Sequence, residues 1–184
     1  MEFEVLTTGR LILKKLTPEI FTYLFENSSK EEIKSLLGLA TEEEFIKEKE
    51  RSTGGYVTYD RTIVAFLLVL KESNETIGRG GFHNWYPAHS RAELGYALNK
   101  EEHKRKGYMT EAVKAIIEYG FSTMNLNRIE AFVGPTNAAS QNIIRNNGFT
   151  QEGHLRQHYC RDGETQDSLI FSLLKDEYKI PKTA

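Results

Sequence analysis

The sequence predicts an α/β protein of the α+β type, built on a mixed, mostly antiparallel sheet of seven strands with helices around it. Segments with the apolar spacing of strands alternate with segments of helical spacing. Their order is strand, helices, three strands, long helix, strand, helix, two strands, which is typical of a mixed α/β sandwich with a largely antiparallel sheet. The middle strands are joined by a turn and a short connection and the last two by a hairpin signal, which favours antiparallel pairing.

Length and composition suit one soluble globular domain over residues 1–184. The chain has 24 basic and 26 acidic side chains, a formal net charge of −2 and 39% hydrophobic residues. This balance argues against a dedicated nucleic-acid binder, which normally shows a basic surface. The longest apolar run, residues 63–70, is too short to span a bilayer, and the acidic start does not resemble a signal peptide. We therefore expect a cytoplasmic protein without a membrane partner.

The N-terminal third begins with one strand and continues with helices. In residues 10–15, Leu11 and Leu13 alternate with Ile12 and Lys14, which predicts a short strand. Thr17 and Pro18 are suited to the N-cap and first position of a helix that continues through Phe25. Residues 30–37 and 42–50 are charged with spaced apolar points and predict two short amphipathic helices.

The middle of the chain predicts three strands and the best-supported helix. Residues 62–71 form a continuous apolar run suited to a buried strand, and residues 76–85 and 91–98 follow as the next two. After a basic segment, apolar residues return with a spacing of 3.6 and predict a long amphipathic helix. These helical positions are Met109, Ala112, Val113, Ile116, Ile117 and Phe121.

The C-terminal third predicts a strand, a helix and two more strands. Residues 128–133 alternate, residues 138–146 are helical and Gly148 ends that helix. Residues 150–159 and 165–174 predict the last two strands, joined at the Arg161-Asp162-Gly163 hairpin signal.

A basic, glycine-containing segment precedes the long helix. Free backbone N–H groups and the positive end of the helix dipole gather at such a position, and Gly107 lets an anion approach the backbone. The segment therefore predicts a phosphate site, although a solvated charge run is the alternative. The triphosphate-binding pattern Gly-x-x-x-x-Gly-Lys-[Ser/Thr] is absent.

Several blocks of sequence, in order, resemble the GNAT acyltransferase superfamily. Lys104-x-x-Gly107-x-Met109 is similar to its [Gln/Arg]-x-x-Gly-x-[Gly/Ala] motif, with a lysine and a methionine in place of the usual residues. Four other blocks resemble the ribosomal-protein-alanine N-acetyltransferase branch. They are 81–85 (GFHNW), 92–96 (AELGY), 133–140 (VGPTNAAS) and 147–149 (NGF). The resemblance covers about residues 8–175 and implies a GNAT-like fold with a splayed parallel strand pair at its centre.

The resemblance implies that acetyl-coenzyme A (acetyl-CoA) is the cosubstrate and lies between the strands at 91–98 and 128–133. The backbone of the first of these strands would pair with the pantetheine arm, the loop amides would hold the pyrophosphate, and Asn137 would contact the arm or only cap its helix. The strand residues are Leu94, Gly95, Tyr96, Ala97 and Leu98, and the loop residues are Lys104, Arg105, Lys106, Gly107, Tyr108, Met109 and Thr110.

For catalysis, the resemblance implies direct attack of an amine on the thioester. Ser140 matches a serine of the branch and is the candidate that protonates the leaving thiolate, with helix capping as its alternative role. Glu93 is the favoured general base and His83 the second candidate, since imidazole titrates near neutral pH. His158 and Tyr159 stand near the position of a base in related enzymes, but neither is a carboxylate.

The expected function is acetyl transfer to a primary amine, and the branch favours a protein N-terminal α-amine. Small amines (polyamines, amino acids, aminoglycosides) and a non-catalytic CoA-binding module are the alternatives. No metal is expected, because His154 and His158 lie in a strand without an acidic partner pattern. Cys160 is the single cysteine, which excludes an intrachain disulfide. Dimers are common in this branch, so the oligomeric state is open between monomer and homodimer.

Overall fold

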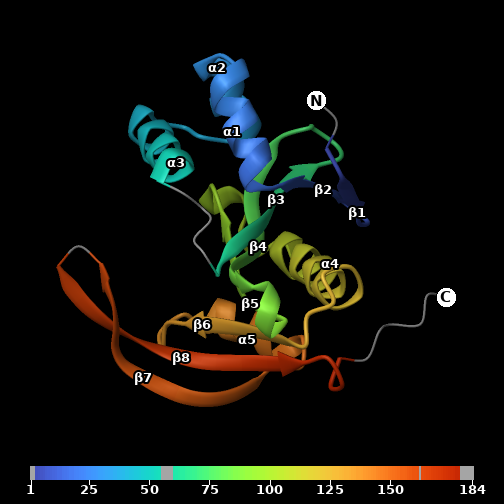
Figure 1. The fold of residues 1–184 in the computed structure, drawn as a ribbon, viewed down its shortest axis with the longest axis vertical. Coiled ribbons are helices and arrows are strands. Elements are labelled where there is room, and N and C mark those ends of the chain that lie inside the picture. Colours follow the sequence, from blue (N-terminus) through green and yellow to red (C-terminus); the bar gives the residue numbers. More distant parts are fainter. Residues whose placement is uncertain (1–2, 55–59, 162, 179–184) are drawn as a thin grey trace.

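The structure, a computed structural model, describes residues 3–54, 60–161 and 163–178. One sheet runs through the protein in the spatial order β1-β2-β3-β4-β5-β6-β8-β7 (Figure 1). Every neighbouring pair is antiparallel except β5 and β6. The strands are β1 (Val5–Thr7), β2 (Leu11–Leu16), β3 (Thr62–Leu70), β4 (Thr76–Tyr86), β5 (Arg91–Leu98), β6 (Arg128–Val133), β7 (Thr150–Arg161) and β8 (Glu164–Leu174).

The mixed, mostly antiparallel sheet is confirmed, but it has eight strands where the sequence predicted seven. The additional strand, β1, pairs with β2 through Thr7 and Ile12 and two further residue pairs. Three residues are too few to show a strand periodicity, so the pattern gave no signal for it.

Five α-helices within the described ranges cover the sheet on both faces. They are α1 (Pro18–Asn27), α2 (Lys30–Leu37), α3 (Glu42–Gly54), α4 (Tyr108–Ser122) and α5 (Ala138–Asn146). Figure 1 shows α1–α3 gathered together, with α4 across the sheet from them. Thr17 caps α1 as predicted, since its side chain accepts a hydrogen bond from the Ile20 N–H at 3.5 Å. Helix α3 continues to Gly54, four residues beyond its predicted end.

Two hydrophobic cores lie on opposite faces of the sheet, and β3 contributes to both. Phe66 and Leu68 pack in the core that includes Ile116 of α4. The intervening Leu67 and Val69 pack in the core formed with α1 and α2. Burial of both faces explains the continuous apolar run, because each such side chain stabilises the fold by about 1.5–3 kcal/mol when it leaves water.

The parallel pair β5–β6 opens after a short contact. Three residue pairs join the strands, the last between Glu93 and Glu130. Beyond Glu93, β5 pairs only with β4, and β6 pairs only with β8, within the described residues. The predicted splay is therefore confirmed, and the edge of β5 from Leu94 to Leu98 has no strand of the described residues beside it.

The last two strands form a long hairpin that curves away from the sheet (Figure 1). Their register shifts between Leu155 and Tyr159, and Gln157 within the shift has a φ of 51°. Such a bulge bends a strand and re-aims its side chains. Asp162 of the predicted turn lies outside the described residues. No helix in the described ranges has the length and apolarity to cross a membrane.

Candidate active site

A cavity of about 340 Å³, here called the split cavity, lies where β5 and β6 part. Residues of β4, β5, β6, α5 and β7 line it, so elements far apart in the sequence meet there. Its polar lining residues are His83, Glu93, Tyr96, Asn137, Ser140 and Tyr159. The structure thus brings the three predicted catalytic residues together with the part of β5 that is predicted to pair with the pantetheine arm.

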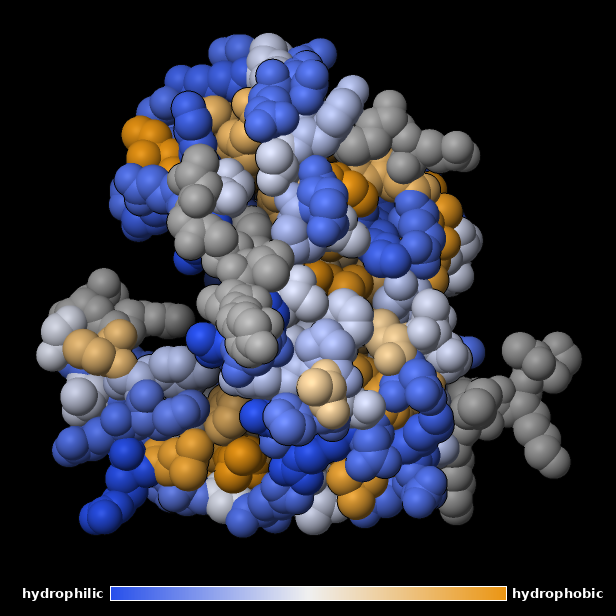
Figure 2. Space-filling view, viewed as in Figure 1, coloured by the Kyte–Doolittle hydropathy of each residue, from blue (hydrophilic) through white to orange (hydrophobic). Residues whose placement is uncertain are grey.

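A second cavity, of about 670 Å³ and here called the helix-side cavity, reaches the same point from the face that carries α1–α3. It is lined by Arg51 of α3, by β3 residues and by β4 and β5. The two cavities share His83, Gly95 and Tyr96. Figure 2 shows the surface hollowed between α3 and the β7–β8 hairpin. Molecules that entered the two cavities would therefore meet at the opening in the sheet.

His83 and Glu93 contact each other at this meeting point. Strand pairing places them opposite one another, and His83 Nε2 lies 2.9 Å from Glu93 Oε1. The Asn84 side chain donates to the other carboxylate oxygen at 2.9 Å. Burial raises the pKa of Glu93. The hydrogen bond and the electrostatic interaction with His83, together with the hydrogen bond from Asn84, lower it by more, so the pKa of Glu93 lies below its usual value. Glu93 is 7% exposed, whereas the His83 side chain is 46% exposed.

Gly95 leaves the space that the imidazole of His83 occupies. A Cβ at this position would lie 2.7 Å from His83 Cε1, closer than real atoms approach. Glycine is therefore required for the observed position of the ring, a close approach of the kind that strand glycines permit.

Ser140 and Tyr96 form a hydroxyl pair across the split cavity. Their oxygens are 2.8 Å apart, and either group can donate. Burial raises the pKa of Tyr96, and the hydrogen bond from Ser140 offsets only part of that rise, so the phenol holds its proton. Asn137 caps α5 by accepting the Ser140 N–H at 3.1 Å, which fixes the first turn of the helix and hence the serine. Sequence reasoning assigned Tyr96 only through its backbone and missed the hydroxyl.

The segment before α4 has the geometry of an anion site. Gly107 is the N-cap, with a φ of 79°, and no side chain of the described residues caps the helix. The first N–H groups of α4 are therefore available to a ligand, next to the exposed side chains of Arg105 and Lys106. This arrangement, together with the open edge of β5, fits the phosphate and pantetheine parts of acetyl-CoA.

Arg10 of the N-terminal segment anchors this loop, and no motif or spacing in the sequence points to it. Its guanidinium donates to the Lys106 carbonyl at 2.9 Å and to Glu111 of α4 at 2.8 Å, and it stacks on Tyr108 at 4.6 Å from the ring centre. The predicted Lys104 side chain instead pairs with Glu101. Lys104 therefore contributes less directly to the loop than its motif position suggests.

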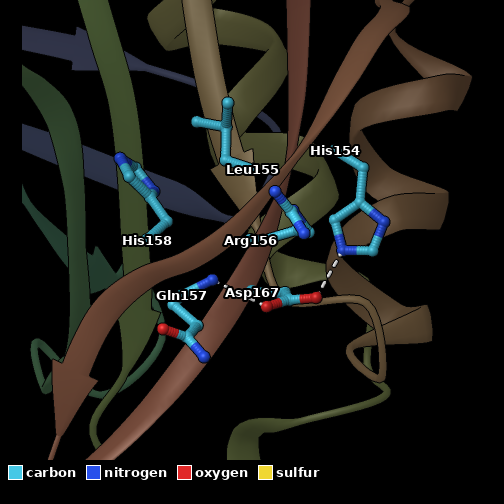
Figure 3. Close-up of a pocket in the computed structure, with 6 residues that line it drawn as sticks. All are labelled: His154, Leu155, Arg156, Gln157, His158 and Asp167. Carbon is cyan, nitrogen blue, oxygen red and sulfur yellow. Dashed lines mark hydrogen bonds and ion pairs between the residues drawn. The ribbon is translucent and has the colours of Figure 1, made fainter.

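The β7–β8 hairpin carries a separate open cavity of about 780 Å³ (Figure 3). His154 lies 2.7 Å from Asp167, and the Gln157 N–H donates to the same carboxylate at 2.8 Å. His158 instead contacts the ring of Phe132, at 4.9 Å between centres. The two histidines therefore have different partners. The bulge between them turns the chain so that Tyr159 lines the split cavity.

One group of described residues has the chemistry of metal ligands, namely Glu75, Glu102 and His103. His103 Nε2 lies 3.4 Å from Glu75 Oε1. The ammonium group of Lys100 lies 2.7 Å from Glu75 and 3.5 Å from Glu102. Lys100 thus adds one positive charge to a group with two carboxylates.

The comparisons with known proteins agree with this geometry. A family model described as an acetyltransferase (GNAT) domain matches residues 10–150. The "Uncharacterized N-acetyltransferase p20" of Bacillus licheniformis is 34% identical over 176 residues, covering 95% of this chain and 98% of that protein. A crystal structure of a GNAT-family acetyltransferase from Bacillus anthracis is 25% identical with a TM-score of 0.67, covering 95% of this chain and 100% of that chain.

Two relatives with named substrates match about half of the chain. The [ribosomal protein uS5]-alanine N-acetyltransferase of Escherichia coli is 31% identical over 54% of this chain and 47% of that protein. The spermidine N(1)-acetyltransferase of Escherichia coli is 29% identical over 49% of this chain and 48% of that protein. The family match over most of the chain, together with the splayed strands and the anion loop, establishes that this chain belongs to the GNAT family of N-acetyltransferases.

Proposed function

We propose that this protein transfers the acetyl group of acetyl-CoA to an α-amino group by direct attack within a ternary complex. The observation that carries the proposal is the sharing of His83, Gly95 and Tyr96 by two cavities, one lined also by residues of α3 and β3 and the other by residues of β6 and α5. An enzyme that holds two reactants at one point converts a bimolecular reaction into an effectively unimolecular one. Acetyl-CoA supplies the activated acetyl group.

The open edge of β5 and the start of α4 would hold acetyl-CoA. Backbone groups from Leu94 to Leu98 are free to pair with the pantetheine arm as an added strand would. The amides after Gly107 would bind the pyrophosphate, with Arg105 and Lys106 adding positive charge. A backbone N–H of β5 in the same stretch would stabilise the oxyanion.

His83, positioned by Glu93, is the better candidate for the general base. The lowered pKa of Glu93 makes its carboxylate a weak base toward an ammonium group with a pKa of about 8. Imidazole generally titrates near neutral pH, and His83 is the exposed partner of the pair. Glu93 would orient the ring and stabilise the imidazolium that forms, which reverses the order of preference that the sequence favoured.

Ser140 would donate a proton to the leaving thiolate, and Tyr96 would donate to Ser140. Hydrogen-bonded hydroxyl groups polarise one another, so the pair is a stronger donor than serine alone. Asn137 would keep the serine in place through the cap of α5.

A polypeptide N-terminus is the favoured acceptor. Support comes from the relative named for a ribosomal-protein alanine and from the openness of the surface between α3 and the hairpin. The relative named for spermidine supports a polyamine instead.

The test follows free thiol release from acetyl-CoA with N-terminal peptides, polyamines, amino acids and aminoglycosides, and identifies products by mass. Acceptor-dependent release with an α-amine supports the proposal. Release only with polyamines would contradict the acceptor. Acetyl-CoA binding without release for any amine would favour a non-catalytic CoA-binding module.

A further inference from the structure

Two arginine side chains line the helix-side cavity. Arg51 of α3 and Arg79 of β4 both line it, together with His83. No carboxylate is among the described residues of its lining. The remaining lining residues are glycines and apolar or aromatic side chains. Glu93 is the carboxylate behind His83 at one end of the cavity, and the two arginines lie toward α3 at the other.

One buried carboxylate lies behind the two arginines. Glu48 is 2% exposed and accepts two hydrogen bonds from Arg79, at 2.8 and 3.0 Å. This two-point geometry is the strongest form of such a pair. Arg51 lies 3.7 Å from the same carboxylate, beyond hydrogen-bond distance, and its side chain is 62% exposed. Arg51 therefore presents an exposed guanidinium at the wall of the cavity.

The guanidinium groups of these arginines disfavour the binding of a polycation. A polyamine or an aminoglycoside carries further ammonium groups that would approach Arg51 and Arg79, and like charges at an interface lower affinity. A carboxylate on the acceptor would instead pair with the exposed guanidinium of Arg51, whose planar fork matches it.

We infer that the acceptor carries a carboxylate close to its reacting amine, and that Arg51 binds this carboxylate. The inference rests on the proposed function and narrows its acceptor to α-amines with a nearby negative charge. That chemistry occurs in a polypeptide whose first residues are acidic and in a free amino acid. Arg79, fixed by Glu48, holds the second positive charge at the wall of the cavity.

The test compares acceptors that differ only in charge. Peptides that begin with Asp are paired with peptides that begin with Asn, because the two are nearly identical in shape. L-alanine and L-alaninamide form the second pair, which reports on a free α-carboxylate. For each pair, kcat/KM is measured by thiol release, and acceptor binding is measured by calorimetry in the presence of CoA, which needs no turnover.

We expect at least one of the anionic acceptors to exceed its neutral partner by about tenfold in both readouts, with a preference that falls as salt rises. The pair that shows it identifies the source of the carboxylate. Arg51→Gln should reduce the ratio to near one, and Arg51→Lys should retain a part of it. Lys49→Gln removes the same charge from the same helix outside the cavity lining, and it should leave the ratio unchanged.

The outcomes separate the inference from the proposed function. Equal kcat/KM and equal binding for both members of each pair would overturn the inference and leave acetyl transfer to an α-amine intact. A preference that Lys49→Gln reduces as much as Arg51→Gln would also overturn it, because the effect would then come from net charge. Absence of turnover with all α-amines would contradict the proposed function, and the binding ratios would still decide whether Arg51 selects a carboxylate.

Discussion

Replacement of Gly95 by alanine tests whether the position of His83 controls catalysis. The new Cβ would stand 2.7 Å from Cε1 and 3.0 Å from Nδ1 of the imidazole. Non-bonded carbon atoms prefer separations of about 3.5–4.0 Å, so the ring must retreat by about 0.8 Å or more. A shift of that size can stretch the 2.9 Å contact between His83 Nε2 and Glu93 beyond hydrogen-bond range.

The expected result is a large loss of activity with a small loss of stability. A displacement near 1 Å at a reacting group costs about 100-fold in rate, and a general base contributes about 100-fold to 10,000-fold. We therefore expect kcat/KM of Gly95→Ala to fall by about 100-fold. Because the His83 side chain is 46% exposed, the ring can turn toward solvent, and the free energy of unfolding should change by about 0.5 kcal/mol or less.

The assay is thiol release with the best acceptor, combined with a double-mutant cycle. In a His83→Ala background the added methyl group meets no ring, so Gly95→Ala should cost little further activity. Gly134→Ala is the matched control, because a methyl group added there would meet no atom of the described residues within 4 Å, and activity should be unchanged. An equal loss with and without His83 would refute the reasoning and show that the methyl group obstructs the substrates directly.

Further predictions concern the hydroxyl pair, the anion loop and acid stability. Ser140→Ala and Tyr96→Phe should each lower kcat by about 100-fold and leave the affinity for acetyl-CoA unchanged. The double variant should lose less than the product of the two single losses, and full activity in both single variants would show that the pair has no role in the mechanism. Arg10→Gln should weaken acetyl-CoA binding about tenfold in calorimetry, since it releases the Lys106 carbonyl and Glu111, and unchanged affinity would contradict this role. Hydrogen bonds from Arg128 and Ser172 lower the pKa of Glu152 to about 2, so its contribution to stability is present above pH 4.5 and lost as pH falls toward 2. Urea unfolding from about pH 2.5 to 6 should show that the stability advantage of wild type over Glu152→Gln shrinks with acid; an advantage independent of pH would contradict it.

Much of the fold follows from local sequence signals. The apolar spacing from Met109 to Phe121 predicted α4, and the continuous run in β3 reflected burial on both faces of the sheet. The short strand β1 and the last turn of α3 were missed, because three residues give no periodicity and because residues 51–54 are polar.

The candidate site was less accessible to sequence reasoning, because its contacts join distant segments. Arg10 reaches Glu111 across 101 residues, and Tyr96 reaches Ser140 across 44, and no local pattern records such pairs. The pKa of Glu93 depends on which partners surround its carboxylate in the folded protein. A motif can therefore name Glu93 and His83, while only the fold indicates which of them is suited to act as the base.

In the proposed mechanism, the two substrates react directly where both cavities meet. Initial velocities measured over a matrix of acetyl-CoA and acceptor concentrations test it most directly, together with mass analysis of the protein after acetyl-CoA alone. We predict intersecting reciprocal plots and no acetylated protein, as a ternary complex requires. Parallel plots with a stable acetyl group on the chain, for example at the exposed Cys160, would contradict the account, because they would show that the acetyl group passes through the enzyme first.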